Sequence, residues 1–183
     1  MVESVGRIFL AVGLPDATRH AIAAYLTAHI PPLPGAVVPP ENWHLTLRFL
    51  GDVAPAAFDR LIFEVSEADL GAPFRLSFAG LGAFPKPARA SVVWLGVDRG
   101  QEELMALASA VDHAVDLAGF GPDDRSFRPH LTLARLRPTR DVWPWLESEP
   151  LPPVAFAVGS VGIYRSHLGG GPARYELLDS VSL

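Results

Sequence analysis

The sequence contains the tetrapeptide His-Leu-Thr-Leu twice, at residues 44–47 and again at residues 130–133. Because successive side chains of a strand point to opposite sides, each copy would present its His and Thr on one face and its two Leu on the other. Only five of the 183 residues are Thr, so finding Thr two places after two of the six His by chance is of the order of 1%. The repeat therefore predicts two equivalent, half-buried strands.

The surroundings of the two tetrapeptides repeat as well. Phe9, in a short apolar run, lies 35 residues before His44, and Trp94, in a second such run, lies 36 residues before His130. In both intervals a β-type run is followed by a helical pattern and then by a loop containing Pro and Gly. We expect an internal duplication whose two lobes face each other and bring the two His strands together across a cleft.

Periodicity predicts the elements of each repeat unit. In the first unit we expect a strand over 7–12, a helix over 16–29, the His strand over 44–50, a helix over 55–68 and a strand over 74–84. In the second we expect a strand over 91–97, a helix over 101–117, the His strand over 130–133, a helix over 142–149 and a strand over 154–164, and a last strand over 175–182 closes the fold.

The expected fold class is therefore α/β (α+β). A single bilobal domain covers residues 1–183, with pseudo-two-fold repeat units at about 5–84 and 90–164 and a closing strand at 175–182. Two sheets rich in antiparallel strands would surround a central cleft, with the helices on the outside.

Composition narrows the chemistry that such a cleft can perform. The chain has no Cys, which excludes disulfides, thiolate nucleophiles and thiolate metal sites. A net charge of −5 argues against broad contact with duplex nucleic acid, but it leaves room for recognition of one terminal phosphate. Arg is suited to forked recognition of phosphate oxygens, and five Arg gather around the second tetrapeptide: Arg125, Arg128, Arg135, Arg137 and Arg140.

Targeting signals are not found in this sequence. Its first residues contain no basic segment leading into a long apolar run, and no stretch reaches the roughly 18 apolar residues of a membrane span. We therefore expect a soluble, cytoplasmic protein that does not act on membranes.

Two imidazoles and two hydroxyls on one cleft suit acid–base displacement at phosphorus, because His titrates near neutral pH. Two other interpretations remain open. A metal site would also use His, but the sequence has no His-x-His or His-x-x-x-His spacing, and no Asp or Glu shares the His faces of the two strands. Duplication of a purely structural unit would repeat the tetrapeptide too. The phosphate-cradling Gly-x-x-x-x-Gly-Lys pattern is absent.

With these motifs in view, the chain resembles the 2H phosphoesterases and, among them, the RNA 2′,3′-cyclic phosphodiesterases formerly described as 2′-5′ RNA ligases. The resemblance covers nearly the whole length. It is carried by Asn-Trp-His-Leu-Thr-Leu-Arg-Phe-Leu-Gly at 42–51, Phe-Arg-Pro-His-Leu-Thr-Leu-Ala-Arg at 127–135, and the segments 7–11, 92–96, 164–166 and 174–175. It implies a bilobal fold with both His and both Thr in a central cleft, no metal and no cofactor.

The resemblance also implies an activity and its partners. RNA ends or oligonucleotides with a terminal 2′,3′-cyclic phosphate would be hydrolysed to 2′-phosphomonoesters. One neutral His would take a proton from the attacking water, and the other His would protonate the departing ribose oxygen. We expect His44 to be the acid and His130 the base.

The same reasoning extends to residues that would hold the phosphate or the base. Thr46 and Thr132 would donate hydrogen bonds to nonbridging oxygens, and Arg135 would offset the charge developing on them. Further candidates for contact with the substrate are Arg128, Arg48, Phe9, Phe49 and, near the expected edge of the cleft, His167. The two Arg are equally compatible with ordinary surface charges, and core packing is the favoured use of the two Phe, with stacking of a nucleobase as the alternative.

Other functions remain compatible with the sequence. A related enzyme of this kind could act on another small cyclic or 2′-5′-linked nucleotide, and a non-catalytic module could bind nucleotides or RNA ends. Ligation is accessible by microscopic reversibility, although no nucleotide-activating motif supports an energy-driven ligase. We expect the protein to be a monomer.

Overall fold

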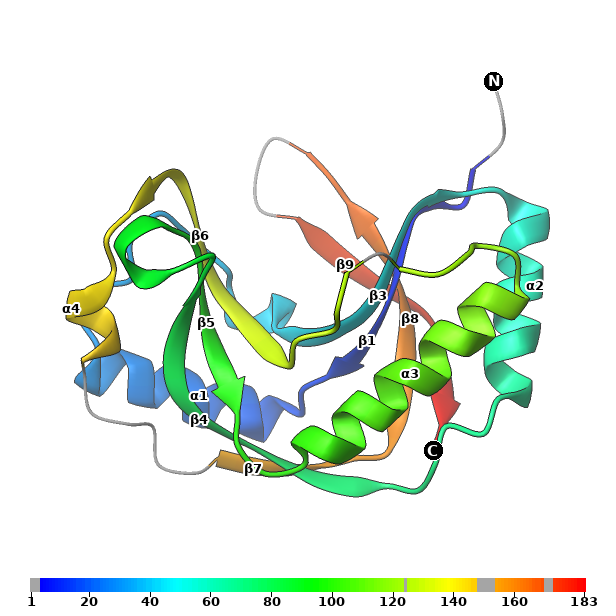
Figure 1. Ribbon diagram of the computed structural model, residues 1–183, viewed down its shortest axis with the longest axis horizontal. Coiled ribbons are helices and arrows are strands. Elements are labelled where there is room, and N and C mark those ends of the chain that lie inside the picture. The colour runs from blue at the N-terminus through cyan, green and yellow to red at the C-terminus, as the bar shows by residue number, and fades with distance from the viewer. Residues whose placement is uncertain (1–3, 124, 148–153, 170–172) are drawn as a thin grey trace.

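The computed structural model describes residues 4–123, 125–147, 154–169 and 173–183, and its strands form two antiparallel sheets (Figure 1). In chain order the strands are β1 (Gly6–Gly13), β2 (Ala36–Val37), β3 (His44–Val53), β4 (Phe74–Phe84), β5 (Ala90–Val97), β6 (His130–Arg140), β7 (Val154–Val158), β8 (Ser160–His167) and β9 (Arg174–Ser182). The α-helices are α1 (Asp16–His29), α2 (Pro55–Glu67), α3 (Gln101–Leu117) and α4 (Trp143–Leu146), and two short 3-10 helices are η1 (Pro40–Asn42) and η2 (Pro87–Arg89).

The order of the strands relates the two sheets by a pseudo-two-fold duplication. One sheet runs β3-β1-β8-β9 and the other β2-β6-β5-β4-β7. Strand β1 thus corresponds to β5, β3 to β6, and β8 to β4, so each sheet combines strands from both halves of the chain. The expected fold class, a duplicated α/β fold with two antiparallel sheets, is confirmed.

The strand expected over 154–164 is wrong in one respect, because it is two strands in different sheets. Strand β7 pairs with β4, whereas β8 pairs with β1. The change of sheet occurs at Gly159, whose carbonyl accepts a hydrogen bond of 3.0 Å from the backbone of Leu183. An apolar run is compatible with either sheet, so periodicity alone could not locate this break.

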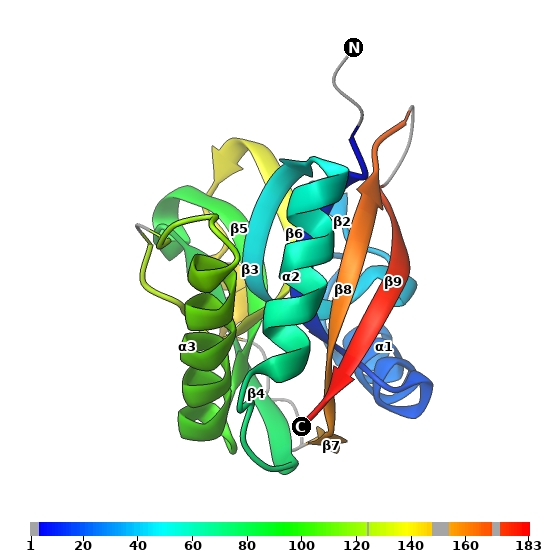
Figure 2. The same cartoon turned by 90° about the vertical axis from the view of Figure 1, so that its right-hand side faces the viewer.

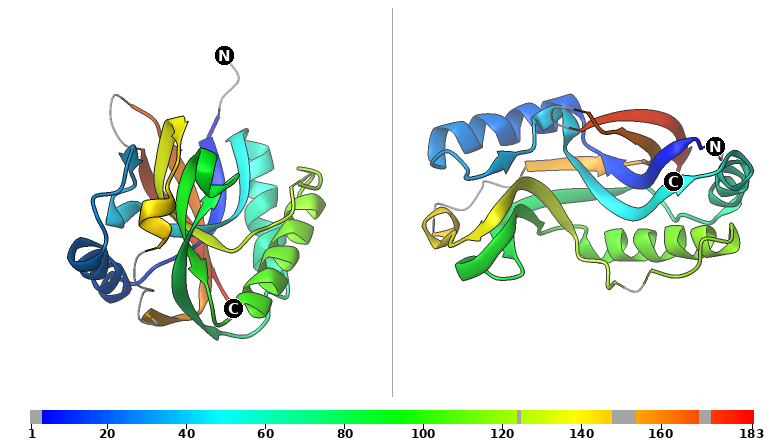
Figure 3. Two further views of the ribbon diagram at one scale, coloured as in Figure 1. Left: turned by 60° about the vertical axis from the view of Figure 1, so that its left-hand side comes forward. Right: turned by 90° about the horizontal axis from the view of Figure 1, so that it is seen from above.

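The helices cover the outside of the sheets, as expected. Figures 2 and 3 show α2 and α3 side by side along one flank and α1 apart from them. The expected helix over 142–149 is shorter, Trp143–Leu146, and residues 148 and 149 lie outside the described part of the chain. Among the described residues no helix is both long and apolar enough to cross a membrane. The four Leu of the repeated tetrapeptides are buried in the core, as the alternation predicts: Leu45, Leu47, Leu131 and Leu133.

Both His strands contain a β-bulge at the same place. Leu10 lies opposite Arg48 and Ala11 opposite Thr46, so Leu47 is an extra residue in β3. In β6, Val93 lies opposite Ala134 and Trp94 opposite Thr132, so Leu133 is extra in the same way. A bulge reverses the alternation of side chains beyond it. The residues directly after the bulge are therefore buried, and the next ones, Phe49 and Arg135, share the face of the His and Thr.

Arg48 is carried into the interior by this reversal. It is only 6% exposed, and its guanidinium forms an ion pair with Asp112 on α3. It also donates a hydrogen bond of 2.6 Å to the carbonyl of Gly121 and lies 3.9 Å from Asp123. Arg48 thus joins β3 to α3 and to the loop that leads into β6.

Replacing Arg48 by Met should lower the free energy of unfolding by about 2–3 kcal/mol, because Asp112 and the carbonyl of Gly121 lose the charged donor that reaches them from the core. Urea denaturation followed by circular dichroism measures this change. Arg75→Met, at an exposed position of β4, is the matched control and should change stability by less than about 0.5 kcal/mol. Equal stability of the two variants would contradict the structural role of Arg48.

Candidate active site

The two His of the repeated tetrapeptide are held in the same way. Each begins its strand, and each Nδ1 contacts the backbone carbonyl two residues earlier: 2.7 Å from His44 to Asn42 and 2.6 Å from His130 to Arg128. A carbonyl oxygen only accepts hydrogen bonds, so both Nδ1 atoms carry the hydrogen. In the neutral ring this leaves the lone pair on Nε2, which is the atom able to exchange a proton with a substrate.

The two His strands come together where the sheets meet. Strands β3 and β6 contact each other, and the segment before β3 is tied to β6 by a hydrogen bond of 2.8 Å from the backbone of Val38 to Leu133. The imidazoles influence each other electrostatically, since the charge of His130 contributes to lowering the pKa of His44. Arg135 lowers the pKa of both rings. The two histidines and Arg135 therefore form one electrostatic cluster.

Aromatic side chains enclose His44 on several sides. Ring centroids lie 4.8 Å away at Phe9, 5.0 Å at Tyr175 in an edge-on contact, and 6.5 Å at Tyr164. Burial in this box lowers the pKa of His44 to about 4, and the positive charge of Arg19 on α1 adds a smaller effect in the same direction. His44 is consequently neutral at physiological pH.

His130 is less enclosed. Phe84 meets its ring edge-on at 5.0 Å and Trp94 lies at 6.5 Å, while the guanidinium of Arg128 lies 5.7 Å from the centroid of the Phe84 ring. Burial again lowers the pKa, and hydrogen bonding to the Arg128 carbonyl partly opposes that effect. The two histidines are therefore equivalent in backbone geometry but differ in their surroundings.

Glycines make room for the aromatic rings beside each His. A Cβ at Gly82 would overlap the indole of Trp94, and one at Gly162 would overlap the ring of Tyr164. These glycines occupy corresponding positions, because Gly82 pairs with Trp94 on β5 and Gly162 pairs with Ala11 on β1. The equivalent glycines are a further trace of the duplication, but the rings laid across them differ in origin: Trp94 lies on β5 and Tyr164 on β8.

The sequence-predicted residues divide into those that join the cluster and those that do not. Thr46 and Thr132 are half-buried on the strand faces of the two His, and Arg135 is exposed on the face of His130. Arg48 is not brought there, because the bulge turns it toward α3, and we assign it no contact with phosphate.

The remaining candidates for contact with the substrate, two Phe and one His, differ in how far they are exposed and in what they contact. Phe9 is 3% exposed and packs against His44, so its ring forms the wall of the site and is not a free stacking surface. Phe49 is 40% exposed, with the guanidinium of Arg7 lying 5.3 Å from its ring centroid. His167 is hydrogen-bonded at 2.7 Å to Glu176 between β8 and β9.

Sequence reasoning gave no role in the site to three residues that shape the surroundings of His44, although two of them lie in segments that carry the resemblance: Arg19, Tyr164 and Tyr175. Tyr164 pairs across the sheet with Phe9, and the pKa of its hydroxyl is raised by burial. The available signal was weak, because recognising this contact required knowing that β8 lies beside β1.

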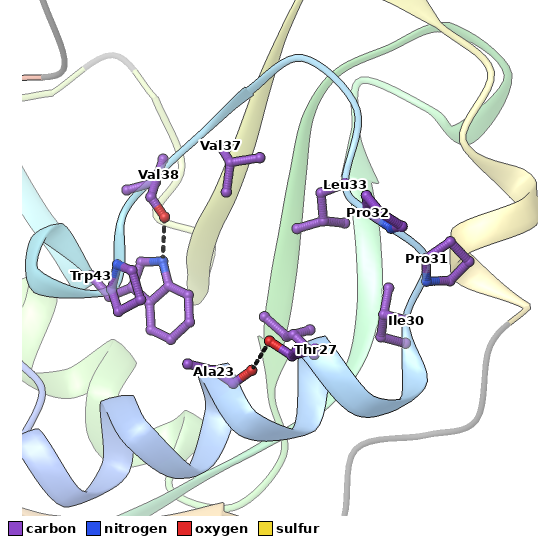
Figure 4. A pocket seen from close by; sticks show the side chains of 11 residues that line it. Ala23, Thr27, Ile30, Pro31, Pro32, Leu33, Val37, Val38 and Trp43 are labelled. Carbon is purple, nitrogen blue, oxygen red and sulfur yellow. Dashed lines mark hydrogen bonds between the residues drawn. The ribbon is translucent and has the colours of Figure 1, made fainter.

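An apolar pocket of about 410 Å³ lies beside the site, between α1 and the segment leading to β3 (Figure 4). Trp43, directly before His44, lines it and donates a hydrogen bond of 3.0 Å from its indole to the carbonyl of Val38. Its lining is mainly apolar and includes no titratable side chain, so it offers no group for acid–base chemistry. Among the described residues no group of three or more His, Asp or Glu is arranged to hold a metal ion.

Comparison with protein families shows to which family the chain belongs. The model of LigT-like phosphoesterases matches residues 12–94 and, a second time, residues 95–173. The chain belongs to the LigT-like phosphoesterase family. The two matches divide the family member into two copies, each containing one His-Leu-Thr-Leu tetrapeptide, in agreement with the duplicated sheets.

Similar proteins and structures cover this LigT-like phosphoesterase to different extents. An RNA 2′,3′-cyclic phosphodiesterase of Aeropyrum pernix is 40% identical over 111 residues, which are 60% of this chain and 62% of that protein. One of Escherichia coli K12 is 31% identical over 94% of this chain and 93% of its own length. The crystal structure of E. coli LigT complexed with 3′-AMP has a TM-score of 0.78 at 30% identity and covers 99% of both chains.

The tautomers and pKa values of the two histidines can be tested by NMR. In long-range 15N-edited spectra at pH 7.5, both rings should have a protonated Nδ1 and an unprotonated Nε2, because each Nδ1 donates to a carbonyl. On acidification His44 should titrate near pH 4 and His130 at a higher pH, since His44 is the more enclosed ring. A protonated Nε2 in either neutral ring would contradict the assignment.

The lowered pKa of His44 should also make the free energy of unfolding depend on pH. The unfolded chain binds the His44 proton with a pKa near 6.5, above the value of about 4 in the folded protein. The stabilising contribution of neutral His44 is thus complete above pH 6.5 and is lost as the pH falls toward 4.

Proposed function

We propose that this chain hydrolyses 2′,3′-cyclic phosphate ends of RNA to 2′-phosphomonoesters, as a monomer and without a metal ion. The observation that carries the proposal is the pair of histidines anchored through Nδ1 in one electrostatic cluster, each with Nε2 available for proton transfer. Relatives named RNA 2′,3′-cyclic phosphodiesterase, together with the 3′-AMP complex of E. coli LigT, support the choice of substrate.

In this reaction a water molecule attacks phosphorus in line with the bond to the ribose 3′ oxygen. As the new bond between oxygen and phosphorus forms and the bond to O3′ breaks, one His accepts the water proton at Nε2 and the other donates its Nε2 proton to O3′. The product is a 2′-phosphate. Proton transfer leaves each His in the opposite state, and exchange with solvent restores both.

The surroundings of the two rings favour His44 as the base and His130 as the acid, the reverse of the assignment expected from the sequence. A base must be unprotonated at the start, and burial among the aromatic rings around His44 keeps it neutral. His130 is less enclosed and closer to solvent, so a bound phosphate anion can more readily stabilise its protonated form.

Three other side chains would stabilise the phosphoryl group. The hydroxyls of Thr46 and Thr132 share the faces of the histidines and would donate to the nonbridging oxygens. Arg135, on the face of His130, would offset the negative charge that builds up on these oxygens.

His44→Ala and His130→Ala should each reduce kcat/KM for 2′,3′-cyclic AMP by at least ~100-fold, because each removes one proton transfer. His20→Ala, at an exposed position of α1, is the matched control and should leave the rate unchanged. The wild-type rate should also persist in EDTA. Near-normal turnover in either site variant, or loss of the rate with the chelator, would reject this mechanism.

A substrate that needs no acid separates the roles of the two histidines. The 4-nitrophenolate of bis(4-nitrophenyl) phosphate leaves without being protonated, so His130→Ala should lose less than ~10-fold on this diester while losing at least ~100-fold on 2′,3′-cyclic AMP. His44→Ala should lose at least ~100-fold on both, since the base is needed in each case. The opposite pattern would restore His44 as the acid.

A further inference from the structure

Positively charged side chains gather at one end of the second lobe, away from the two histidines. Figure 1 shows the end of β6 and the connection between β4 and β5 together at the upper end of the left-hand lobe. The connection contains η2, which contacts β6. The backbone N–H of Val142, just beyond β6, donates a hydrogen bond of 3.0 Å to the carbonyl of Pro87 in η2. We call the four exposed cations of this region the basic tip: Lys86, Arg89, Arg137 and Arg140.

The charges of the basic tip are not neutralised. None of its four side chains has an ion pair with another described residue. The neighbouring acid, Asp141, accepts a hydrogen bond of 3.0 Å from the backbone of Trp143 and keeps its negative charge, so the four cations outnumber it. In the other sheet, by contrast, Arg165 is paired with Glu176 at 2.7 Å. In a chain with a net charge of −5, four unpaired cations at one tip make a local site for an anionic partner.

Two further arginines make this surface continuous with the histidine cluster. Arg135 lies on the same strand as the tip and influences both imidazoles. Arg128 holds His130 through its backbone carbonyl and places its guanidinium over Phe84, at the end of β4 next to η2. A polyanion with its end at the histidines would therefore meet positive charge all the way along β6.

We propose that the basic tip binds the phosphates of a single-stranded RNA whose 3′ end occupies the histidine cluster. This inference rests on the proposed function and specifies its substrate as an RNA chain, with the nucleotides 5′ of the cyclic phosphate running along β6. The contacts are with the backbone and independent of base sequence. A cyclic mononucleotide is too short to reach the tip and gains nothing from it.

The test compares one substrate that reaches the tip with one that does not. The variant Arg89→Gln/Arg137→Gln/Arg140→Gln should lower kcat/KM roughly tenfold at low salt for a single-stranded dodecamer ending in a 2′,3′-cyclic phosphate, with the change mainly in KM. Its kcat/KM for 2′,3′-cyclic AMP should stay at the wild-type value. The slope of log kcat/KM against log salt should become shallower by about 2, at about 0.7 for each lost phosphate contact.

A matched control removes the same charge elsewhere. Arg60→Gln/Arg75→Gln/Arg99→Gln changes three exposed arginines of α2, β4 and the turn before α3, and should leave the dodecamer rate and its salt slope unchanged. Equal losses in the two triple variants, or equal losses on the dodecamer and on 2′,3′-cyclic AMP, would overturn the proposal.

Direct binding separates this inference from the proposed function. Fluorescence anisotropy with a dodecamer ending in a 3′-phosphate should give a roughly tenfold weaker Kd for the tip variant than for the wild type and the control. If the wild-type protein hydrolyses neither substrate, the proposed function fails while the anisotropy still decides whether the tip binds RNA. Turnover of both substrates with no difference in Kd would reject the basic tip alone.

Discussion

Backbone pairing between the two halves of the chain is the constraint on which this structure depends. Strand β8 from the second half pairs with β1, and β4 from the first half pairs with β5. The pairing brings Tyr164 into the sheet that carries His44, and Phe84 into the sheet that carries His130. The surroundings of each histidine are therefore completed by an aromatic residue from the opposite half. The environment of the site thus depends on the same strand pairing that holds each sheet together.

The bulge that follows Thr46 and Thr132 separates the chemistry of the site from the packing of the core. Before the bulge, His and Thr face the site and Leu faces inward; after it, Arg48 and Ala134 turn inward. In the first copy the inward position holds a cation that binds α3, and in the second it holds a small apolar residue. The two copies share the same backbone geometry at the bulge, but the side chains at the equivalent positions, Arg48 and Ala134, have different roles.

Much of this arrangement could be predicted from the sequence, because its signals are repeats and alternations that can be read along the chain without knowing which strands pair. The spacing of the tetrapeptides predicts the duplication, and alternation predicts which faces Leu45 and Leu131 occupy. The misassigned parts depended on non-local pairing. The bulge that buries Arg48 is visible only in the register with β1, and the change of sheet at Gly159 only in the partners of β7 and β8. The difference between the histidines is likewise tertiary, since the rings around His44 come from β1, β8 and β9.

The exchange of β4 and β8 has a consequence for how such a chain could arise. One repeat unit alone would lack the strand that flanks its central strand, and would expose the edge that the other half now covers. Such a unit could cover this edge by pairing with an identical copy in a two-fold dimer, each contributing a strand to its neighbour. Because both units belong to one chain here, their sequences can differ and one imidazole can be more enclosed than the other, which no homodimer with identical environments can achieve.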